Sequence, residues 1–341
     1  DAVENLAALQ GQQASAIPWA IGVRCAGVSR ARVEESFARG ELVRSWPMRG
    51  TVHVTSARDH HWLRRLLRHR RASWERQALA LGLTAALVER AAQVACDLLE
   101  TSPLGVSRAE LVEAWGSSGI DTVTASSSRE GLRRRHLIMR LHLDGVLTAG
   151  PVRAGEHLIV DARSLPAAPG VAKGEPGHEE ALAVLAARYA WGHGPIDEAD
   201  LARWTGLTLT EARRALAGAR VAGESVGLPL AECGGGLARA DLADLVEDYR
   251  AEAEIMRALP PFDELHVGYK DRSCLTDEAG EALICPAKNG MFRPIVVEGG
   301  RVVAVRAPGR EIVMVKGYES RQRPAARAFD DWEKWLSETQ Q

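Results

Sequence analysis

The apolar positions of the chain recur mostly with helical spacing, and the polar stretches between them carry capping and turn residues. The clearest helix covers residues 84–100, where apolar residues lie on one face. Ser107 and Glu110 have the spacing of a capping box at the start of another helix, 108–115. Further helices are predicted at about 1–10, 19–27, 30–39, 57–81, 128–143, 178–191, 197–205, 210–219, 240–256 and 325–339.

Short apolar runs beside turn residues add a small amount of β structure. Three pairs of runs predict hairpins: 42–46 with 51–55, 146–149 with 157–160, and 294–297 with 302–305. Residues 282–285 predict a further short strand, and residues 230–236 a loop. The predicted fold class is therefore α+β, mainly α with small β-hairpins and a C-terminal part that contains β structure.

Three helices followed by a hairpin is the plan of a winged helix, and the pattern repeats along the chain. It predicts a first winged helix with a connector helix in 1–82, a second in 83–164 and a third in 178–257. The first opens within a helix, so we expect it to be incomplete at its N-terminus. Residues 258–341 form a hairpin region and a terminal helix, and 165–177, rich in Pro, Ala and Gly, predict a linker.

Composition narrows the class of protein. No apolar run in the 341 residues approaches the roughly 20 residues of a membrane span, and no apolar leader opens the chain. The 5 cysteines lack C-x-x-C spacing, and no H-E-x-x-H motif is present. We therefore expect a protein of the reducing cytoplasm, with no contact to membranes and no structural zinc or iron–sulfur site.

The net charge of −2 conceals an uneven distribution. Residues 1–150 hold 20 Arg against 15 Asp and Glu, which is +5 and leaves −7 for the rest. Arginines cluster within 64–71 and again at 133–135, on predicted helices. Such a basic face can bind phosphates although the whole chain is acidic. The alternative is a solvated helix face.

Three glutamines lie where Gly11 and Pro18 interrupt the helical pattern near the N-terminus. In an extended segment Gln10 and Gln12 would point to the same side, so both amides could enter one cleft. Two alternatives remain open: a polar linker with solvated glutamines, and a shift of one residue that pairs Gln13 instead.

Four stretches together carry a resemblance to a known family. They are residues 6–24 (LAALQGQQASAIPWAIGVR), 44–54 (RSWPMRGTVHV), 194–206 (GPIDEADLARWTG) and 259–273 (LPPFDELHVGYKDRS) with 289–297 (NGMFRPIVV). In this order they resemble the AlkZ/YcaQ family of bacterial DNA glycosylases, from residue 6 to about 307. Members carry a Gln-x-Gln or Gln-x-Asp pair, then a Trp, an Arg-Gly-Thr and a His. Here these are Gln10, Gln12, Trp46, residues 49–51 and His53.

The resemblance implies a monofunctional DNA glycosylase with tandem winged helices in a C-shaped arrangement. Its substrate would be damaged double-stranded DNA, on which it would act as a monomer associated with the nucleoid. It would need no metal or organic cofactor, because hydrolysis of an N-glycosidic bond needs only water. Members with Gln-x-Gln resemble the group that removes bulky N7-alkylguanine adducts or interstrand crosslinks, and some of these protect antibiotic producers from their own DNA-alkylating product. Glutamine cannot act as a general base, so the amides would position a water molecule, which suits a lesion that leaves readily.

The candidate site residues follow from the residues and the resemblance together. Gln10 and Gln12 are the predicted catalytic pair, and Asp263 is a supporting residue that either stabilises cationic charge or caps a turn. The predicted contacts to DNA are His53, Arg49, Arg133, Arg134, Tyr269, Lys270, Arg272 and Arg293. His53 could instead be satisfied within its hairpin, and residues 270–272 could form a local ion-pair cluster.

Two other classes of function remain open on the sequence. One is a winged-helix transcriptional regulator, which would bind undamaged duplex sequence-specifically. The other is a protein that binds lesions or the free drug without releasing a base. Base release from alkylated DNA separates both from a glycosylase.

Overall fold

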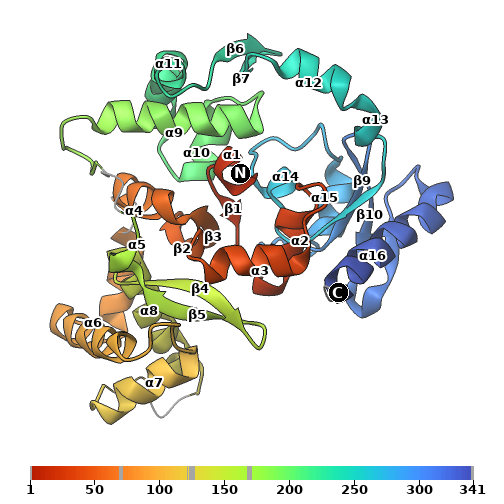
Figure 1. The fold of residues 1–341 in the computed structure, drawn as a ribbon. Helices are drawn as coiled ribbons and strands as arrows, with labels where there is room; N and C mark the ends of the chain where they lie inside the picture. Colours follow the sequence, from red (N-terminus) through yellow and green to blue (C-terminus); the bar gives the residue numbers. More distant parts are fainter. Residues whose placement is uncertain (1, 69–71, 121, 123–126, 167–170, 339–341) are drawn as a thin grey trace. The chain divides into compact units, whose positions relative to one another are not determined.

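The computed structural model describes residues 2–68, 72–120, 122, 127–166 and 171–338 (Figure 1). Its contacts divide the chain into two compact units. Unit 1 combines Asp1–Val33 with Leu182–Gln341, and unit 2 is Glu34–Ala181. Among the described residues, no helix is long and apolar enough to cross a membrane.

Unit 2 consists of two hairpins and a group of helices. Its strands and helices are β2 (Leu42–Met48), β3 (Thr51–Ser56), α4 (Ala57–Leu66), α5 (Ala72–Ala80), α6 (Ala85–Glu100), α7 (Arg108–Ser117), α8 (Ser127–Asp144), β4 (Leu147–Arg153), β5 (Glu156–Asp161) and the 3-10 turn Ala162–Ser164. The strands are ordered β3-β2-β4-β5, and Arg44 opposite Ala149 joins the two hairpins. α3 (Arg30–Ala38) leads into this unit from unit 1.

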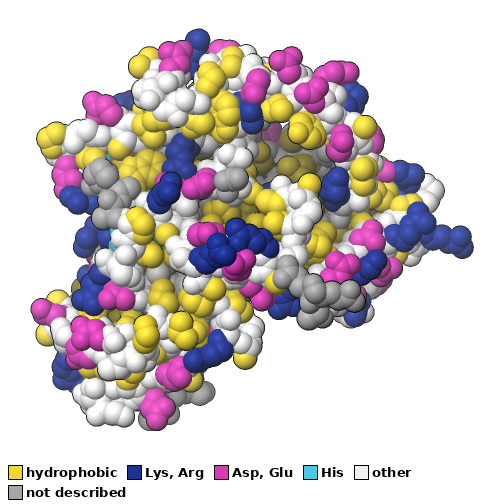
Figure 2. All heavy atoms as spheres, in the orientation of Figure 1, with side chains coloured by type: hydrophobic (Ala, Val, Ile, Leu, Met, Phe, Trp, Pro, Cys, Tyr) yellow, Lys and Arg dark blue, Asp and Glu magenta, His cyan; other side chains and the backbone are white. Residues whose placement is uncertain are grey.

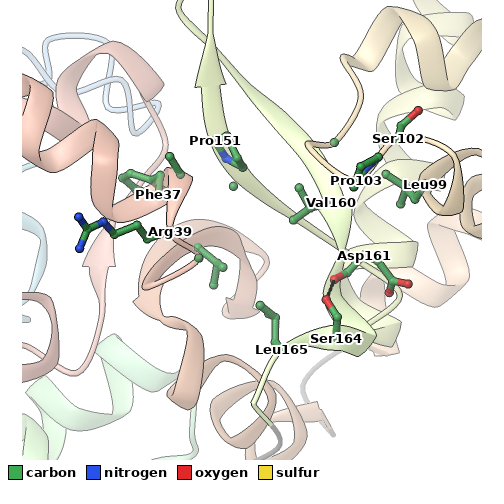
Figure 3. A pocket seen from close by; sticks show the side chains of 15 residues that line it. Phe37, Arg39, Leu99, Ser102, Pro103, Pro151, Val160, Asp161, Ser164 and Leu165 are labelled. Carbon is green, nitrogen blue, oxygen red and sulfur yellow. Dashed lines mark hydrogen bonds between the residues drawn. The ribbon is translucent and has the colours of Figure 1, made fainter.

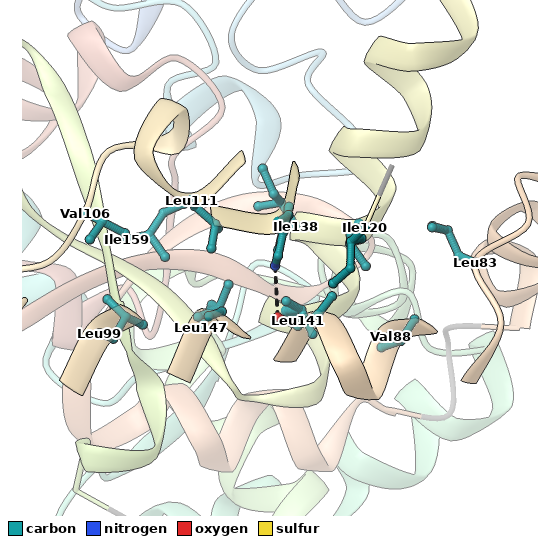
Figure 4. Packing of buried hydrophobic residues seen from close by; sticks show 14 of the residues in the cluster. Leu83, Val88, Leu99, Val106, Leu111, Ile120, Ile138, Leu141, Leu147 and Ile159 are labelled. Carbon is teal, nitrogen blue, oxygen red and sulfur yellow. Dashed lines mark hydrogen bonds between the residues drawn. The ribbon is translucent and has the colours of Figure 1, made fainter. Parts of the chain in front are cut away.

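The core of unit 2 lies between α6, α7, α8 and the β4–β5 hairpin (Figure 4). Leu111 and Leu141 pack there in the same cluster as Ile159. Trp115 is fully buried, and its indole N–H donates to the carbonyl of Ala91, 2.9 Å away. A buried tryptophan needs this partner because an unpaired indole N–H would be costly. These contacts join α7 to α6.

Unit 1 carries the N-terminal segment and the C-terminal half of the chain. Its first elements are α1 (Ala2–Asn5), β1 (Leu9–Gln10), the 3-10 turn Ala14–Ala16 and α2 (Ile17–Gly22). They are followed by α9 (His178–His193), α10 (Glu198–Thr205), α11 (Leu209–Ser225), β6 (Leu230–Cys233), β7 (Gly236–Arg239), α12 (Leu242–Asp248), α13 (Arg250–Ala253), β8 (Arg257–Leu259), α14 (Glu264–Val267), α15 (Glu278–Ile284), β9 (Ile295–Glu298), β10 (Arg301–Arg306), the 3-10 turn Pro308–Arg310, β11 (Ile312–Met314), the 3-10 turn Glu319–Arg321 and α16 (Gln322–Ser337).

A four-stranded antiparallel sheet in the order β11-β10-β9-β8 organises the C-terminal part of unit 1. The apolar side of α16 packs on it through Phe329 and Trp332 (Figure 1). Trp19 of α2 lies beside Trp332, with 6.3 Å between ring centroids, and donates its indole N–H to Ala258 of β8 at 2.8 Å. The segment after the predicted glutamine pair is therefore held by the C-terminal sheet and helix.

Several local predictions are confirmed. Ser107 and Glu110 form the expected capping box. Thr208 and Glu211 form a second one at the start of α11, where the sequence leaves both Thr208 and Thr210 as candidate caps. The last hairpin, β9–β10, turns at Gly299 and Gly300 as predicted. The fold is α+β, as the pattern of apolar residues indicated.

Other local predictions are wrong. The helix expected at 1–10 ends at Asn5, because Ala7 adopts a left-handed conformation (φ 58°) and the chain then enters β1. Residues 230–236 contain strand β6 rather than a loop, and β7 pairs with it through a turn of Gly234 and Gly235, both at positive φ. Residues 282–285 lie mainly in helix α15, which Asp277 caps, instead of a strand.

Two predicted long helices are interrupted. The connector helix expected at 57–81 contains α4 and α5, with 69–71 outside the described residues. The helix expected at 240–256 is two short helices, α12 and α13. Parts of the predicted linker (167–170) and the end of the terminal helix (339) also lie outside the described residues.

Candidate functional site

The glutamine segment lies in unit 1, in the extended stretch after α1. Gln10 is the last residue of β1, and Gln12 follows in a bend. Both are half-buried, and Gly11 between them is buried. Gln13 is exposed, and its amide donates to the hydroxyl of Ser15 at 3.2 Å. The two half-buried side chains are therefore those of the predicted pair, and the third glutamine faces solvent.

The backbone of this segment is held by an interior carboxylate that is distant in sequence. The N–H of Gln10 donates to Oε2 of Glu264, 3.1 Å away. The other oxygen of Glu264 accepts the indole N–H of Trp204 at 2.7 Å and lies 3.3 Å from Nε2 of His193. Glu264 is only 1% exposed, so these hydrogen bonds replace its hydration.

Aromatic side chains surround this carboxylate. The ring of Tyr189 lies 4.4 Å from that of His193 and 4.7 Å from that of Trp204, between centroids. The hydroxyl of Tyr269 donates to the carbonyl of His193 at 3.0 Å. Burial raises the pKa of Tyr269, and the nearby carboxylate of Glu264 raises it further, so the phenol stays protonated and continues to donate.

Asp263, the predicted supporting residue, makes two kinds of contact. Its side chain caps α14 by accepting the N–H of Leu265 at 2.9 Å. Its two oxygens also accept hydrogen bonds from the two terminal nitrogens of Arg24, at 2.9 and 2.7 Å. Burial lowers the pKa of Arg24, but the charge and hydrogen bonds of Asp263 outweigh it and the pKa is raised. Asp263 thus caps a turn and also binds a cationic side chain of the protein itself.

Two of the predicted DNA contacts, Arg49 and His53, lie in unit 2, in the β2–β3 hairpin. Arg49 has a left-handed backbone (φ 52°) in the turn, and one terminal nitrogen lies 3.1 Å from Nε2 of the fully buried His53. The other ring nitrogen of His53 lies 3.0 Å from the carbonyl of Thr51. A guanidinium can only donate, so these contacts fit a neutral imidazole that donates from Nδ1 and accepts at Nε2.

Arg133 and Arg134 lie on α8 of unit 2 and are half-buried. Among the residues that the structure describes, neither forms an ion pair. Burial lowers the pKa of Arg108 at the start of α7, and the positive charges of Arg134 and Arg135 lower it further. This cluster, Arg108 with 133–135, concentrates positive charge where α7 begins near α8.

Among the other predicted DNA contacts in unit 1, the side chains of Arg272 and Arg293 bond within the protein, whereas Lys270 is held through its backbone. The backbone N–H of exposed Lys270 donates to Asp200 at 2.7 Å. Arg272 lies 3.2 Å from the ring of His266 and 3.5 Å from Glu281, so its ion pair is with α15 and not with a neighbour within 270–272. Arg293 donates to the carbonyl of Leu283 at 3.2 Å.

Basic and acidic side chains are mixed on the face of the molecule drawn in Figure 2, where Lys and Arg alternate with Asp and Glu. Among the described residues there is no cluster of His, Cys, Asp or Glu that could hold a metal ion. The five cysteines carry free thiols.

Unit 2 also contains a cavity of about 360 Å³ (Figure 3). Its lining comes from the end of α3, the β4–β5 hairpin and the segment after α6, and includes Phe37, Pro103 and Val160. Asp161 at its edge is paired with Arg163 at 2.7 Å. None of the predicted site residues lines this cavity.

Sequence reasoning missed the interior part of the glutamine site. Glu264 and Trp204 each lie within a stretch that carried the family resemblance, 259–273 and 194–206, but no local signal joins either to Gln10. The structure shows that these two stretches meet at the Glu264 carboxylate. The same carboxylate accepts the hydrogen bond from the backbone N–H of Gln10 in the glutamine segment.

Comparison with known proteins identifies the class of protein. The family model described as "DNA glycosylase AlkZ-like" matches residues 3–326. The chain therefore belongs to the AlkZ-like DNA glycosylase family, and it is a DNA-repair enzyme that acts on DNA.

A solved structure supports the fold. DNA glycosylase AlkZ of Streptomyces sahachiroi is similar, with a TM-score of 0.64 over 96% of this chain and 89% of that one, at 23% sequence identity. No protein in the search of curated sequences matches the chain.

The arginine cluster of unit 2 leads to a testable prediction. If Arg133 and Arg134 contact DNA phosphates, Arg134→Gln should weaken DNA binding and reduce the slope of log K against log salt by about 0.9. Binding measured at several salt concentrations checks this. Arg213→Gln is the matched control, because exposed Arg213 pairs with Glu198 in unit 1, and it should leave the slope unchanged. An unchanged slope for the Arg134 variant would remove this surface from the DNA interface.

Proposed function

We propose that this glycosylase hydrolyses the N-glycosidic bond of N7-alkylguanine in damaged double-stranded DNA, with Gln10 and Gln12 positioning the attacking water. The observation that supports it most is the half-buried glutamine pair, in which the backbone N–H of Gln10 is bonded to Glu264, while the third glutamine is exposed. The predicted reacting groups are amides, which bind and orient water but do not take its proton.

The chemistry of the lesion suits such a site. Alkylation at N7 gives the guanine a positive charge, so the base departs as a neutral molecule and the glycosidic bond is already labile. A general base typically contributes about 10²–10⁴ in rate, and a substrate with a good leaving group tolerates its loss. Correct placement of the water then becomes the main contribution of the enzyme.

Finer points, which rest on the sequence pattern and on the resemblance, stay predictions. They are a preference for bulky adducts or interstrand crosslinks, self-resistance to a DNA-alkylating antibiotic, the division into three winged helices, action as a monomer, and a place on the nucleoid. Family membership favours an enzyme over the two alternatives, a transcriptional regulator and a protein that binds lesions without cutting.

Base release tests the proposal directly. A duplex with one N7-methylguanine is incubated with the enzyme, and heat or alkali then converts abasic sites into strand breaks. We expect release above the spontaneous rate, and a duplex with a bulky N7 adduct tests the preferred size. Binding to both substrates without release from either would contradict the proposal and favour the lesion-binding alternative.

A further inference from the structure

Glu264 has no part in the reaction as proposed above, yet it is an ionisable group that accepts a hydrogen bond from the glutamine segment itself. It begins α14 and is buried, with Trp204 and His193 on one oxygen and the Gln10 N–H on the other. The contact to Gln10 joins residues that are 254 positions apart in the sequence.

Stability alone does not account for a carboxylate at this position. A buried carboxylate carries a large desolvation cost, and well-packed apolar residues commonly serve a core equally well. What the carboxylate adds is a strong hydrogen bond to one specific backbone N–H, because bonds to a charged acceptor are about twice as strong as neutral ones. The carboxylate therefore contributes chiefly by fixing the position of the Gln10 backbone.

The surroundings fix the carboxylate itself. Trp204 and His193 reach it from α10 and α9, and the hydroxyls of Tyr189 and Tyr269 donate to the carbonyls of Gly268 and His193, at 2.6 and 3.0 Å.

Close packing at two glycines confines the segment further. A Cβ at Gly268 would lie 2.6 Å from the carbonyl oxygen of Glu264 and 3.2 Å from Oε1. A Cβ at Gly192 would overlap the carbonyl oxygen of Asn5, so the end of α9 lies directly against the segment that leads to Gln10. The carboxylate and the chain that it binds thus have little freedom to move apart.

We propose that Glu264 is a positioning residue of base excision. It fixes the backbone N–H of Gln10, and through it the direction in which the side chains of Gln10 and Gln12 leave the chain. The effect on activity rests on the proposed function, whereas the effect on the segment does not. Catalytic geometry must be held to a fraction of an ångström, and the bend after β1 has no regular secondary structure to hold it.

Glu264→Gln tests this, because an amide has one acceptor where the carboxylate has two. Its single oxygen can accept from Gln10 or from Trp204, and the other donor is left facing the amide NH₂. We expect the single-turnover rate of base release to fall by about tenfold or more, with the dissociation constant for DNA within about twofold of wild type. Hydrogen exchange of a peptide covering 6–13 should become faster.

A second substitution separates positioning from charge. Trp204→Phe removes the competing indole donor, so in the double variant W204F/E264Q the amide can turn its oxygen toward the Gln10 N–H and its NH₂ toward Nε2 of His193, which can accept in the matching tautomer. We expect the double variant to recover part of the rate and of the slow exchange that E264Q loses, and W204F alone to be slower than wild type because it removes one of the groups that hold the carboxylate. Recovery of slow exchange without recovery of rate would overturn the proposal and assign the effect to the negative charge.

Two further outcomes are decisive. A wild-type rate and wild-type exchange in E264Q would also overturn the proposal. If E264Q does not fold, Glu264→Asp replaces it, since it keeps the charge but withdraws the carboxylate by one methylene and should lower the rate. If the wild type releases no base, the proposed function fails, and the exchange of residues 6–13 in these variants still decides whether Glu264 positions the segment.

Discussion

Gln12→Ala is expected to lower the rate of N7-methylguanine release about 100-fold or more while DNA binding changes little. The reason is that the amide holds the attacking water, and a misplaced reacting group commonly costs a factor of about 10². Truncation to Ala also removes a half-buried side chain at the surface, where little core packing is lost. Single-turnover release and a binding isotherm, measured on the same duplex, separate the two quantities.

Gln13→Ala is the matched control for this experiment. It removes the same amide one residue further on, where the side chain is exposed and bonded to Ser15. We expect it to keep the wild-type rate, and Gln10→Ala to behave like Gln12→Ala. If Gln13→Ala abolished release and Gln12→Ala did not, the register of the pair would be shifted by one residue and the present assignment would be wrong.

Local signals predicted the parts of the fold that local contacts stabilise. The capping boxes at Ser107 and Thr208 join residues three apart, and the β9–β10 turn needs only Gly299 and Gly300. The box at Ser107 and the β9–β10 hairpin agree with the prediction, whereas the sequence left the cap of α11 open between Thr208 and Thr210. The β6–β7 turn carries the same Gly-Gly signal and was missed, although Gly234 and Gly235 adopt the positive φ that the signal indicates.

Long-range contacts explain why the helix predicted at residues 1–10, next to the site, was wrong. The spacing of Leu6 and Leu9 predicted a helix up to Gln10, but Ala7 adopts a left-handed conformation and Gln10 becomes extended. Its N–H bonds to Glu264, which no spacing rule connects with residue 10. The glutamine pair could therefore be identified from sequence and resemblance, whereas the carboxylate beneath it required the fold.

Unit 2 is expected to lose stability as the pH falls, because it buries histidines in their neutral form. Burial lowers the pKa of His60 well below its usual 6.5, and the positive field of His61, Arg64 and His142 lowers it further. Burial, with the charge of Arg44, lowers the pKa of His142 to about 3. Both groups are uncharged in the folded state at neutral pH.

The sign of the effect follows from linkage between proton binding and folding. Above the unfolded pKa of about 6.5, neither state binds these protons, and the stability is fully present. Below this pKa, each of these histidines binds a proton in the unfolded chain but stays neutral in the folded protein. Each histidine then costs about 1.4 kcal/mol of unfolding free energy per pH unit, and for His142 this continues down to its folded pKa of about 3.

His60→Leu isolates one of these sites. Among the described residues neither ring nitrogen of His60 has a hydrogen-bond partner, so an apolar side chain of similar size removes an unsatisfied buried group. We expect the variant to be at least as stable as wild type at pH 8 and to lose about 1.4 kcal/mol less per pH unit below pH 6. Urea unfolding followed by hydrogen exchange of α4 and α8 peptides, at pH 8, 6.5 and 5, measures this slope.

His61→Leu is the neighbouring control, because the same substitution removes a different kind of interaction. His61 is half-buried, and its Nε2 lies 2.7 Å from the carbonyl of Ala162. Leucine there leaves that carbonyl without its donor, so we expect a loss of stability already at pH 8. Its slope should change less than that of His60→Leu, because a half-buried ring is less resistant to protonation than a fully buried one. Equal slopes for wild type and His60→Leu would mean that His60 gains its proton in the folded state, and the acid sensitivity of unit 2 would then have to come from His142 and the remaining histidines.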